Sequence, residues 1–254
     1  MTLQDLLDEL ANNLLRDRSD MMSGPEDQLW PDEVLIKYIN EAESLLARKG
    51  LVIRDASTPA VVEVPLVAGT TQYTLHPSVV AVVSAKIDGD TRDLARAGHS
   101  AFSTAQRPDA PFFDDSQLSI LAPGKPLAFS TDEQLDVVSG KSGVVSLRAY
   151  PEPSAEYEGT LIKLRVVRKP ITALTLDNMD ASPEVPEDYH LGLLDWAAYR
   201  ALRNLDSDAG AVEKADKYKK EFDDMVEQAR TDTLRKLFAP LQWGFGRNGF
   251  SWSS

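Results

Sequence analysis

The chain has 254 residues, of which 43% are hydrophobic and 26% charged, a composition typical of a soluble globular protein that buries a sizeable core. It contains no cysteine, which excludes disulfide bonds, thiolate metal ligands and a cysteine nucleophile. The net charge of −13 disfavours binding to a phosphate backbone. The acidic N-terminal segment and the lack of a long apolar run predict no signal peptide and no membrane span, and hence synthesis in a cytosol-like compartment.

Two helices are predicted within the first 55 residues. Leucines recur at helical spacing from Thr2 to about Leu15, and a polar linker follows. The second helix is predicted to start at Trp30-Pro31-Asp32-Glu33, because proline suits the first helical position and acidic residues favour the positive end of the helix dipole. Lys49-Gly50 is expected to end it, since glycine tolerates a left-handed backbone conformation.

From about Val61 to Lys169 the apolar residues alternate or form short runs, which indicates strands. Turn signals such as Asp88-Gly89-Asp90 and Pro123-Gly124 separate these runs and predict an antiparallel sandwich or barrel. The polar stretch from Ala95 to Asp115 is expected to be a long loop. The predicted strands are Val61–Leu66, Gln72–Leu75, Val79–Ile87, Gln117–Leu121, Leu127–Phe129, Leu135–Ser139, Val144–Tyr150 and Thr160–Val167.

A helical hairpin is predicted from Ser182 to Arg230. Its first helix begins at Glu187-Asp188, and Asp206-Ser207-Asp208 supplies the turn and an N-cap for the second. A short connection makes the two helices antiparallel, so that they can pack on the two N-terminal helices. We therefore predict an α+β fold: an antiparallel four-helix module interrupted by a β-sandwich or barrel-like insertion, with an extended C-terminal tail. The predicted boundaries are 1–55 for the N-terminal helices, 56–170 for the insertion, 171–236 for the hairpin and 237–254 for the tail.

After Pro240, glycine alternates with large aromatic residues. Such a segment cannot build a core of its own, because glycine adds no packing and increases the chain entropy that folding must overcome. Tryptophan, phenylalanine and arginine often anchor interfaces, so the segment is predicted either to dock on a partner, or to fold back onto its own domain or fray.

The sequence offers no catalytic or cofactor-binding pattern. Glu187 and His190 have the spacing that places a carboxylate and an imidazole on one helix face, but a di-iron site needs a second such pair and further glutamates. Gly244–Gly249 matches a dinucleotide-binding spacing by letter, but no helix is predicted to follow it. We therefore expect no enzyme, no cofactor and no metal site, with His190 partly exposed at a helix start.

The helical segments resemble a known family. Trp30-Pro-Asp-Glu-Val-Leu-Ile-Lys-Tyr-Ile-Asn-Glu-Ala42, the β-rich middle, and Pro186-Glu-Asp-Tyr-His190 leading into Trp196–Ala201 look like the head-to-tail adaptor (connector) proteins of tailed bacteriophages. The resemblance implies a ring, usually of twelve copies, beneath the portal at one vertex of the capsid. The helical bundles would surround a channel, the C-terminal tails would dock on the portal, and the β insertion would engage tail components. On this resemblance, the predicted docking residues are Phe238, Trp243, Phe245, Arg247, Phe250 and Trp252.

The resemblance thus implies a structural protein of the virion neck, made in the host cytoplasm. Its implied partners are the portal protein, tail nozzle, tail-tube or fibre proteins, and further copies of itself, with double-stranded DNA passing without sequence-specific binding. The acidic surface is compatible with such a channel. A tail-tube or tail-completion protein and a carbohydrate-binding or hydrolytic sandwich remain alternatives. The residues expected to pack in the helical core and the ring are Tyr38, Tyr189, Leu194, Trp196, Tyr199, Tyr218 and Phe222.

Overall fold

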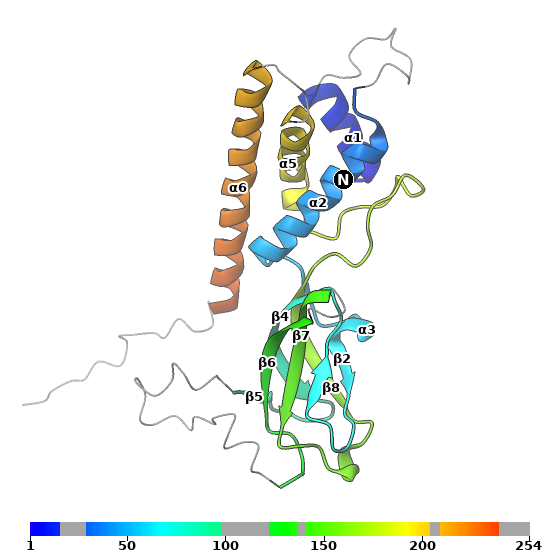
Figure 1. Cartoon of the computed structure of the whole chain (residues 1–254), viewed down its shortest axis with the longest axis vertical. Helices are drawn as coiled ribbons and strands as arrows, with labels where there is room; N and C mark the ends of the chain where they lie inside the picture. Colours follow the sequence, from blue (N-terminus) through cyan, green and yellow to red (C-terminus); the bar gives the residue numbers. More distant parts are fainter. Residues whose placement is uncertain (16–28, 98–121, 137–140, 204–208, 239–254) are drawn as a thin grey trace, which may run out of the picture. The chain divides into compact units, whose positions relative to one another are not determined.

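The chain divides into two compact units (Figure 1). One comprises Met1–Val52 and Thr172–Ser254 and is helical; the other, Ile53–Ile171, consists of two β-sheets. The protein is therefore α+β, as predicted. The computed structural model describes residues 1–15, 29–97, 122–136, 141–203 and 209–238.

The N-terminal helix α1 (Leu3–Asp8) continues directly as the π-helix η1 (Glu9–Leu14). Its start is fixed by a capping box: the Thr2 hydroxyl accepts a hydrogen bond from the backbone N–H of Asp5, and the Asp5 carboxylate accepts one from the N–H of Thr2. The predicted leucine stripe forms its buried face, which consists of Leu3, Leu6, Leu7, Leu10 and Ala11.

Helix α2 (Asp32–Gly50) differs from the prediction at both ends. Pro31 is the N-cap residue and precedes the first helical position. At the other end Leu51, and not Gly50, adopts the left-handed conformation, with φ 57°. A Cβ atom on Gly50 would lie 3.2 Å from the Leu46 side chain and 3.4 Å from that of Ala229. A Cβ atom would therefore press on these neighbours, and glycine permits close packing of the helix end.

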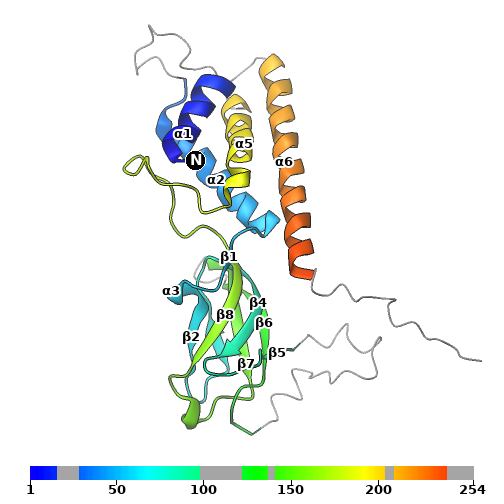
Figure 2. The ribbon, with the colours of Figure 1, turned by 180° about the vertical axis from the view of Figure 1, so that it is seen from behind.

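The C-terminal hairpin begins with a short 3₁₀ turn, η5 (Glu187–Tyr189), and continues as α5 (His190–Arg203) and α6 (Ala209–Phe238). Helix α5 lies beside α6 in both views (Figures 1 and 2). The two helices are antiparallel, because Gly192 is adjacent to Met225 and Trp196 to Phe222. The turn predicted at Asp206–Asp208 lies outside the described residues.

The β unit contains two four-stranded sheets. In the first, the central strand β8 (Leu161–Arg168) pairs antiparallel with β1 (Arg54–Asp55), β2 (Glu63–Pro65) and β4 (Val79–Ile87). In the second, the strand order is β3 (Gln72–Thr74), β7 (Lys141–Tyr150), β6 (Ala128–Asp136) and β5 (Ala95–Arg96), with β5 parallel to β6.

The two sheets enclose one hydrophobic core. Along β8, Ile162, Leu164 and Val166 are buried while Lys163 and Arg165 are exposed, as expected where successive side chains point to opposite faces. The same core contains Phe129 of β6 and Leu147 of β7 from the other sheet. The described strands thus form a sandwich of two separate sheets and no closed barrel.

Several predicted strands differ from those observed. The run from Val61 to Leu66 starts inside a helical turn, α3 (Pro59–Val62), because Pro59 favours the first turn of a helix. The two runs predicted around Leu127 and Leu135 belong to the single strand β6, whose intervening polar residues pair with β7. Ala95–Arg96, predicted as the start of a loop, forms β5. The strand predicted at Gln117–Leu121 lies outside the described residues.

Candidate assembly surface

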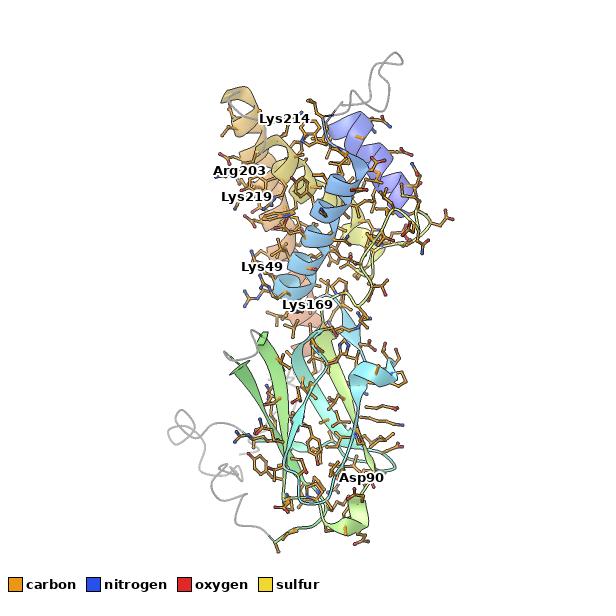
Figure 3. The ribbon with its side chains drawn as sticks, turned by 45° about the vertical axis from the view of Figure 1, so that its right-hand side comes forward. Lys49, Asp90, Lys169, Arg203, Lys214 and Lys219 are labelled. Carbon is orange, nitrogen blue, oxygen red and sulfur yellow. The ribbon has the colours of Figure 1, made fainter. Side chains whose placement is uncertain are left out.

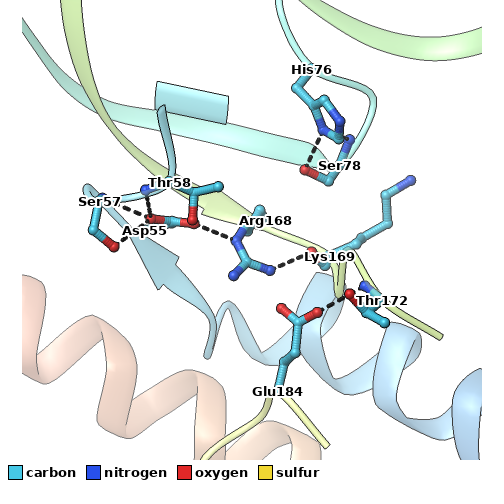
Figure 4. A network of polar contacts seen from close by, with 9 residues as sticks. All are labelled: Asp55, Ser57, Thr58, His76, Ser78, Arg168, Lys169, Thr172 and Glu184. Atoms are coloured by element: carbon cyan, nitrogen blue, oxygen red, sulfur yellow. Dashed lines mark hydrogen bonds and ion pairs between the residues drawn. The ribbon is translucent and has the colours of Figure 1, made fainter. Parts of the chain in front are cut away.

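A polar clamp holds the segment Thr172–Pro186, which we call the strap, against α2. The Asn40 amide donates to the carbonyl of Leu174 and accepts from its N–H, both at 2.9 Å. Glu43, only 1% exposed, accepts from the backbone N–H of Glu184. The Glu184 carboxylate in turn accepts from the N–H of Thr172 at 2.9 Å (Figure 4). The strap is thus fixed by two polar residues of one helix.

The strap also bonds to the starts of α1 and α5. The N–H groups of Leu3 and Gln4 donate to the carbonyls of Ala181 and Met179, at 2.8 and 3.1 Å, and so satisfy donors at the helix start. His190 donates from Nε2 to the carbonyl of Val185 at 2.9 Å and is 3% exposed. The expectation of a partly exposed histidine is therefore wrong, because the strap covers it.

Asp55 fastens the two ends of the β unit, where the chain enters and leaves it. Its carboxylate accepts from the N–H groups of Ser57 and Thr58 at 2.8 and 3.0 Å and from Nε of Arg168 at 2.7 Å (Figure 4). Burial raises the pKa of this carboxyl, but the hydrogen bonds outweigh burial and hold the pKa well below its usual value. Asp55 therefore remains ionised in the folded protein at neutral pH.

Aromatic residues fill the contact between α5 and α6, which we call the seam. The ring of Trp196 lies 5.2 Å from those of Tyr199 and Phe222. A Cβ atom on Gly192 would lie 1.9 Å from the Met225 sulfur, so glycine permits the close approach of the two helices. Nε1 of Trp196 is buried and has no hydrogen-bond partner among the described residues. The seam thus contains an unsatisfied donor.

Asp195 adds an unpaired carboxylate to the seam. Burial raises the pKa of its carboxyl to about 6, and repulsion from Glu221 on α6 contributes. No ion pair or hydrogen bond joins the Asp195 side chain to another described residue. Glu221 has only a loose partner, because the ammonium of Lys217 lies 3.7 Å from its carboxylate. Two neighbouring carboxylates therefore meet at the seam with little compensating positive charge.

Cations cover three tyrosines of the helical unit, where they lie over the faces of the rings. Figure 3 labels Arg203, Lys214 and Lys219 on this unit. The pairs are Arg200 over Tyr38 at 5.3 Å, Arg203 over Tyr199 at 5.7 Å and Lys214 over Tyr218 at 5.8 Å.

An open groove of ≈ 440 Å³ lies where the end of α2 meets α6. Its apolar residues are Leu51 and Val226. Its basic residues, which we call the basic rim, are Arg48, Lys49 and Arg230, and Figure 3 labels Lys49. No ion pair joins the basic rim to any described carboxylate. Asp223 and Glu227 also line the groove, and Asp223 is paired with Lys219 at 2.6 Å.

The predicted packing residues fall into two groups. Tyr38, Leu194 and Phe222 are buried. The partly exposed group consists of Tyr189, Trp196, Tyr199 and Tyr218. Of the predicted docking residues, Phe238 ends α6, but its side chain lies outside the described part of the structure. The same holds for Trp243, Phe245, Arg247, Phe250 and Trp252, and their role stays a prediction.

The sequence reasoning missed Asn40 and Glu43, which hold the strap. Both lie beside the apolar stripe of α2, three residues apart, so that they share one helix face. Polar residues on the edge of a buried stripe are a signal for such a clamp. The sequence does not name the backbone groups that these residues bind, because those lie more than 130 positions away.

In the described part of the chain, no three histidine or acidic side chains come together as a metal site. The spacing of Glu187 and His190 therefore has no supporting ligands there. Among the described helices, none combines the length and the apolar character needed to cross a membrane.

Comparison with protein families identifies the chain. The family model of the SU10 adaptor protein matches residues 1–243, which include both units. The chain belongs to the SU10 adaptor protein family. It is thus a phage adaptor, a structural component of the virion. A search of curated proteins finds no match to this adaptor.

Proposed function

We propose that this phage adaptor forms a ring beneath the portal, where it joins the capsid to the tail and continues the DNA channel. The observation that carries the proposal is the family match over residues 1–243. In this ring, of twelve copies, the C-terminal segment docks on the portal protein. The β unit, which exposes Val67, Val83 and Leu127, contacts tail nozzle, tail-tube or fibre proteins.

The distribution of charge supports a channel formed by the helical unit. Residues 1–52 and 172–254 contain 26 acidic and 15 basic side chains, whereas residues 53–171 contain 14 and 12. Nearly all of the excess negative charge therefore belongs to the helical unit. Such a surface repels the phosphates of double-stranded DNA and lets the DNA pass without binding it.

Deletion of residues 239–254 tests the proposal. The truncated protein retains α6 and the core residues of both units, so we expect an unchanged circular dichroism spectrum but no binding to purified portal protein in a pull-down. A chain that lacks only Ser253 and Ser254 is the control, because it keeps every predicted docking residue. Retained binding by the truncated protein would contradict the docking role. Failure of the full chain to bind the portal protein would contradict the proposed function itself.

A further inference from the structure

We propose that the seam of one copy, at Asp195 and Glu221, binds the basic rim of the next copy. The proposal rests on the ring proposed above, because a head-to-tail ring needs two different, complementary surfaces on every subunit. The present proposal names the residues that make the contact between neighbouring copies. The adjoining copy thereby completes a site that one copy leaves incomplete.

The seam lacks partners within one copy. Asp195 is half-buried without a described partner, and Glu221 has only Lys217 at 3.7 Å. The buried indole N–H of Trp196, next to Asp195 in the chain, has no acceptor among the described residues. Burial without a partner is unfavourable for a carboxylate and for an N–H donor. A neighbour that offers cations would compensate the charge of the two carboxylates.

The groove supplies the complementary charge. Arg48, Lys49 and Arg230 are exposed and form no ion pair with the described carboxylates. Lys219 already neutralises Asp223, so only Glu227 opposes the three cations in the groove. This positive excess stands out in a unit with 26 acidic and 15 basic residues. The groove therefore suits an acidic partner surface.

The two surfaces lie on opposite flanks of α6. Glu221 is close to Asp195 on the α5 side, and Arg230 lines the groove on the α2 side. Glu221 and Arg230 are nine positions apart, about 2.5 helical turns, which places the two side chains on opposite faces of the helix. They cannot pair within one copy. Between copies arranged head to tail, each seam can face the basic rim of its neighbour.

A charge swap in the full chain tests the contact by sedimentation velocity over a range of concentrations, with and without purified portal protein. Asp195→Lys places a cation opposite the basic rim, so we expect the dissociation constant between copies to rise at least about tenfold. Adding Arg48→Glu and Lys49→Glu to Asp195→Lys restores opposite charges and should recover assembly. Asp224→Lys, an equal change on an exposed part of α6, is the matched control.

Asp195→Asn keeps the proposal testable if Asp195→Lys does not fold, because it removes the charge and preserves the shape. We expect it to weaken assembly while the single copy stays folded. A zero-length crosslink between Lys49 and Asp195 of different copies, found by mass spectrometry of isotopically mixed protein, would support the contact. Oligomers that form without this crosslink and tolerate Asp195→Lys overturn the contact alone. Failure to form oligomers with or without portal protein overturns both the contact and the ring.

Discussion

Asp55 and Asp195 show that hydrogen-bond donors, and not burial alone, set the charge of a carboxylate. The Asp55 side chain is 3% exposed, yet its pKa is lowered because Ser57, Thr58 and Arg168 donate to it. Asp195 is more exposed to solvent than Asp55. No described donor compensates for the partial burial of Asp195, however, and its pKa rises to about 6. The first carboxylate stabilises its unit when ionised, whereas the second is tolerated best when protonated.

We predict that Asp55→Asn destabilises the β unit by about 1–3 kcal/mol, because a neutral amide replaces the ionised carboxylate that accepts from Ser57, Thr58 and Arg168. The folded-state pKa lies below the unfolded value of about 3.9, so the wild type should keep its full advantage above that pH and lose it progressively in more acidic solution. Urea denaturation at several pH values measures both effects. Asp88→Asn is the control: both Asp88 and its partner Lys163 are about half exposed, so water screens the pair and the loss should be much smaller than in Asp55→Asn. Equal losses in the two variants would disprove the role of Asp55.

Asp195→Asn should stabilise the single copy at neutral pH, whereas Asp55→Asn should destabilise it. The raised pKa means that stability is highest below the unfolded pKa of about 3.9 and decreases until the pH passes about 6. The variant lacks this decrease, so its thermal midpoint should exceed that of the wild type at pH 7–8 and match it below pH 4. The charged group that acts on Asp195 is Glu221 on α6, which Lys217 approaches to 3.7 Å. A lower midpoint at pH 8 would show that Asp195 has a partner in the single copy.

At the scale of elements, the strap depends on a few polar bonds. Asn40 makes two hydrogen bonds to the backbone of Leu174, which is 6% exposed. Asn40→Ala leaves that N–H and carbonyl unpaired, and we expect a loss of about 1–3 kcal/mol together with faster hydrogen exchange across Thr172–Pro186. Hydrogen exchange read by mass spectrometry measures the effect. Ser44→Ala changes an exposed residue of the same helix and should leave the exchange unchanged. Unchanged exchange in Asn40→Ala would refute the clamp.

The sequence was most informative for elements long enough to repeat an apolar pattern several times. It was least informative for contacts between residues far apart in the chain. The leucine stripe of α1 and the strand Val79–Ile87 could be read directly from apolar spacing. Strands β1 and β5, of two residues each, have too few positions to show a period and exist only through partners far along the chain. The same limit applies to the seam. Its aromatic residues were predicted, but the unpaired state of Asp195 depends on what α6 places opposite it.

At the scale of the whole molecule, the two units differ in both core and charge. The β unit has its own hydrophobic core, formed by both of its sheets. We therefore predict that residues 53–171 fold alone and unfold cooperatively in urea, because the described residues of their core cluster all lie within that range. Circular dichroism and NMR spectra of the excised unit measure this. An excised unit without dispersed amide signals would show that the fold needs the helical unit.

The bonds from Leu3 and Gln4 to the strap impose an order on biosynthesis. A ribosome adds about 5–20 residues per second, so the first helix emerges many seconds before Met179 and Ala181, its hydrogen-bond acceptors, are made. Strand β8 ends at Arg168, so the β unit can fold on the nascent chain while α5 and α6 are still untranslated. The helical unit completes its fold after the β unit, because α5 and α6 follow it in the chain, so the seam and the basic rim form only after Arg230 is made. In the ring proposed above, chains that end before Arg230 would lack the complete basic rim and could not join a growing ring through it.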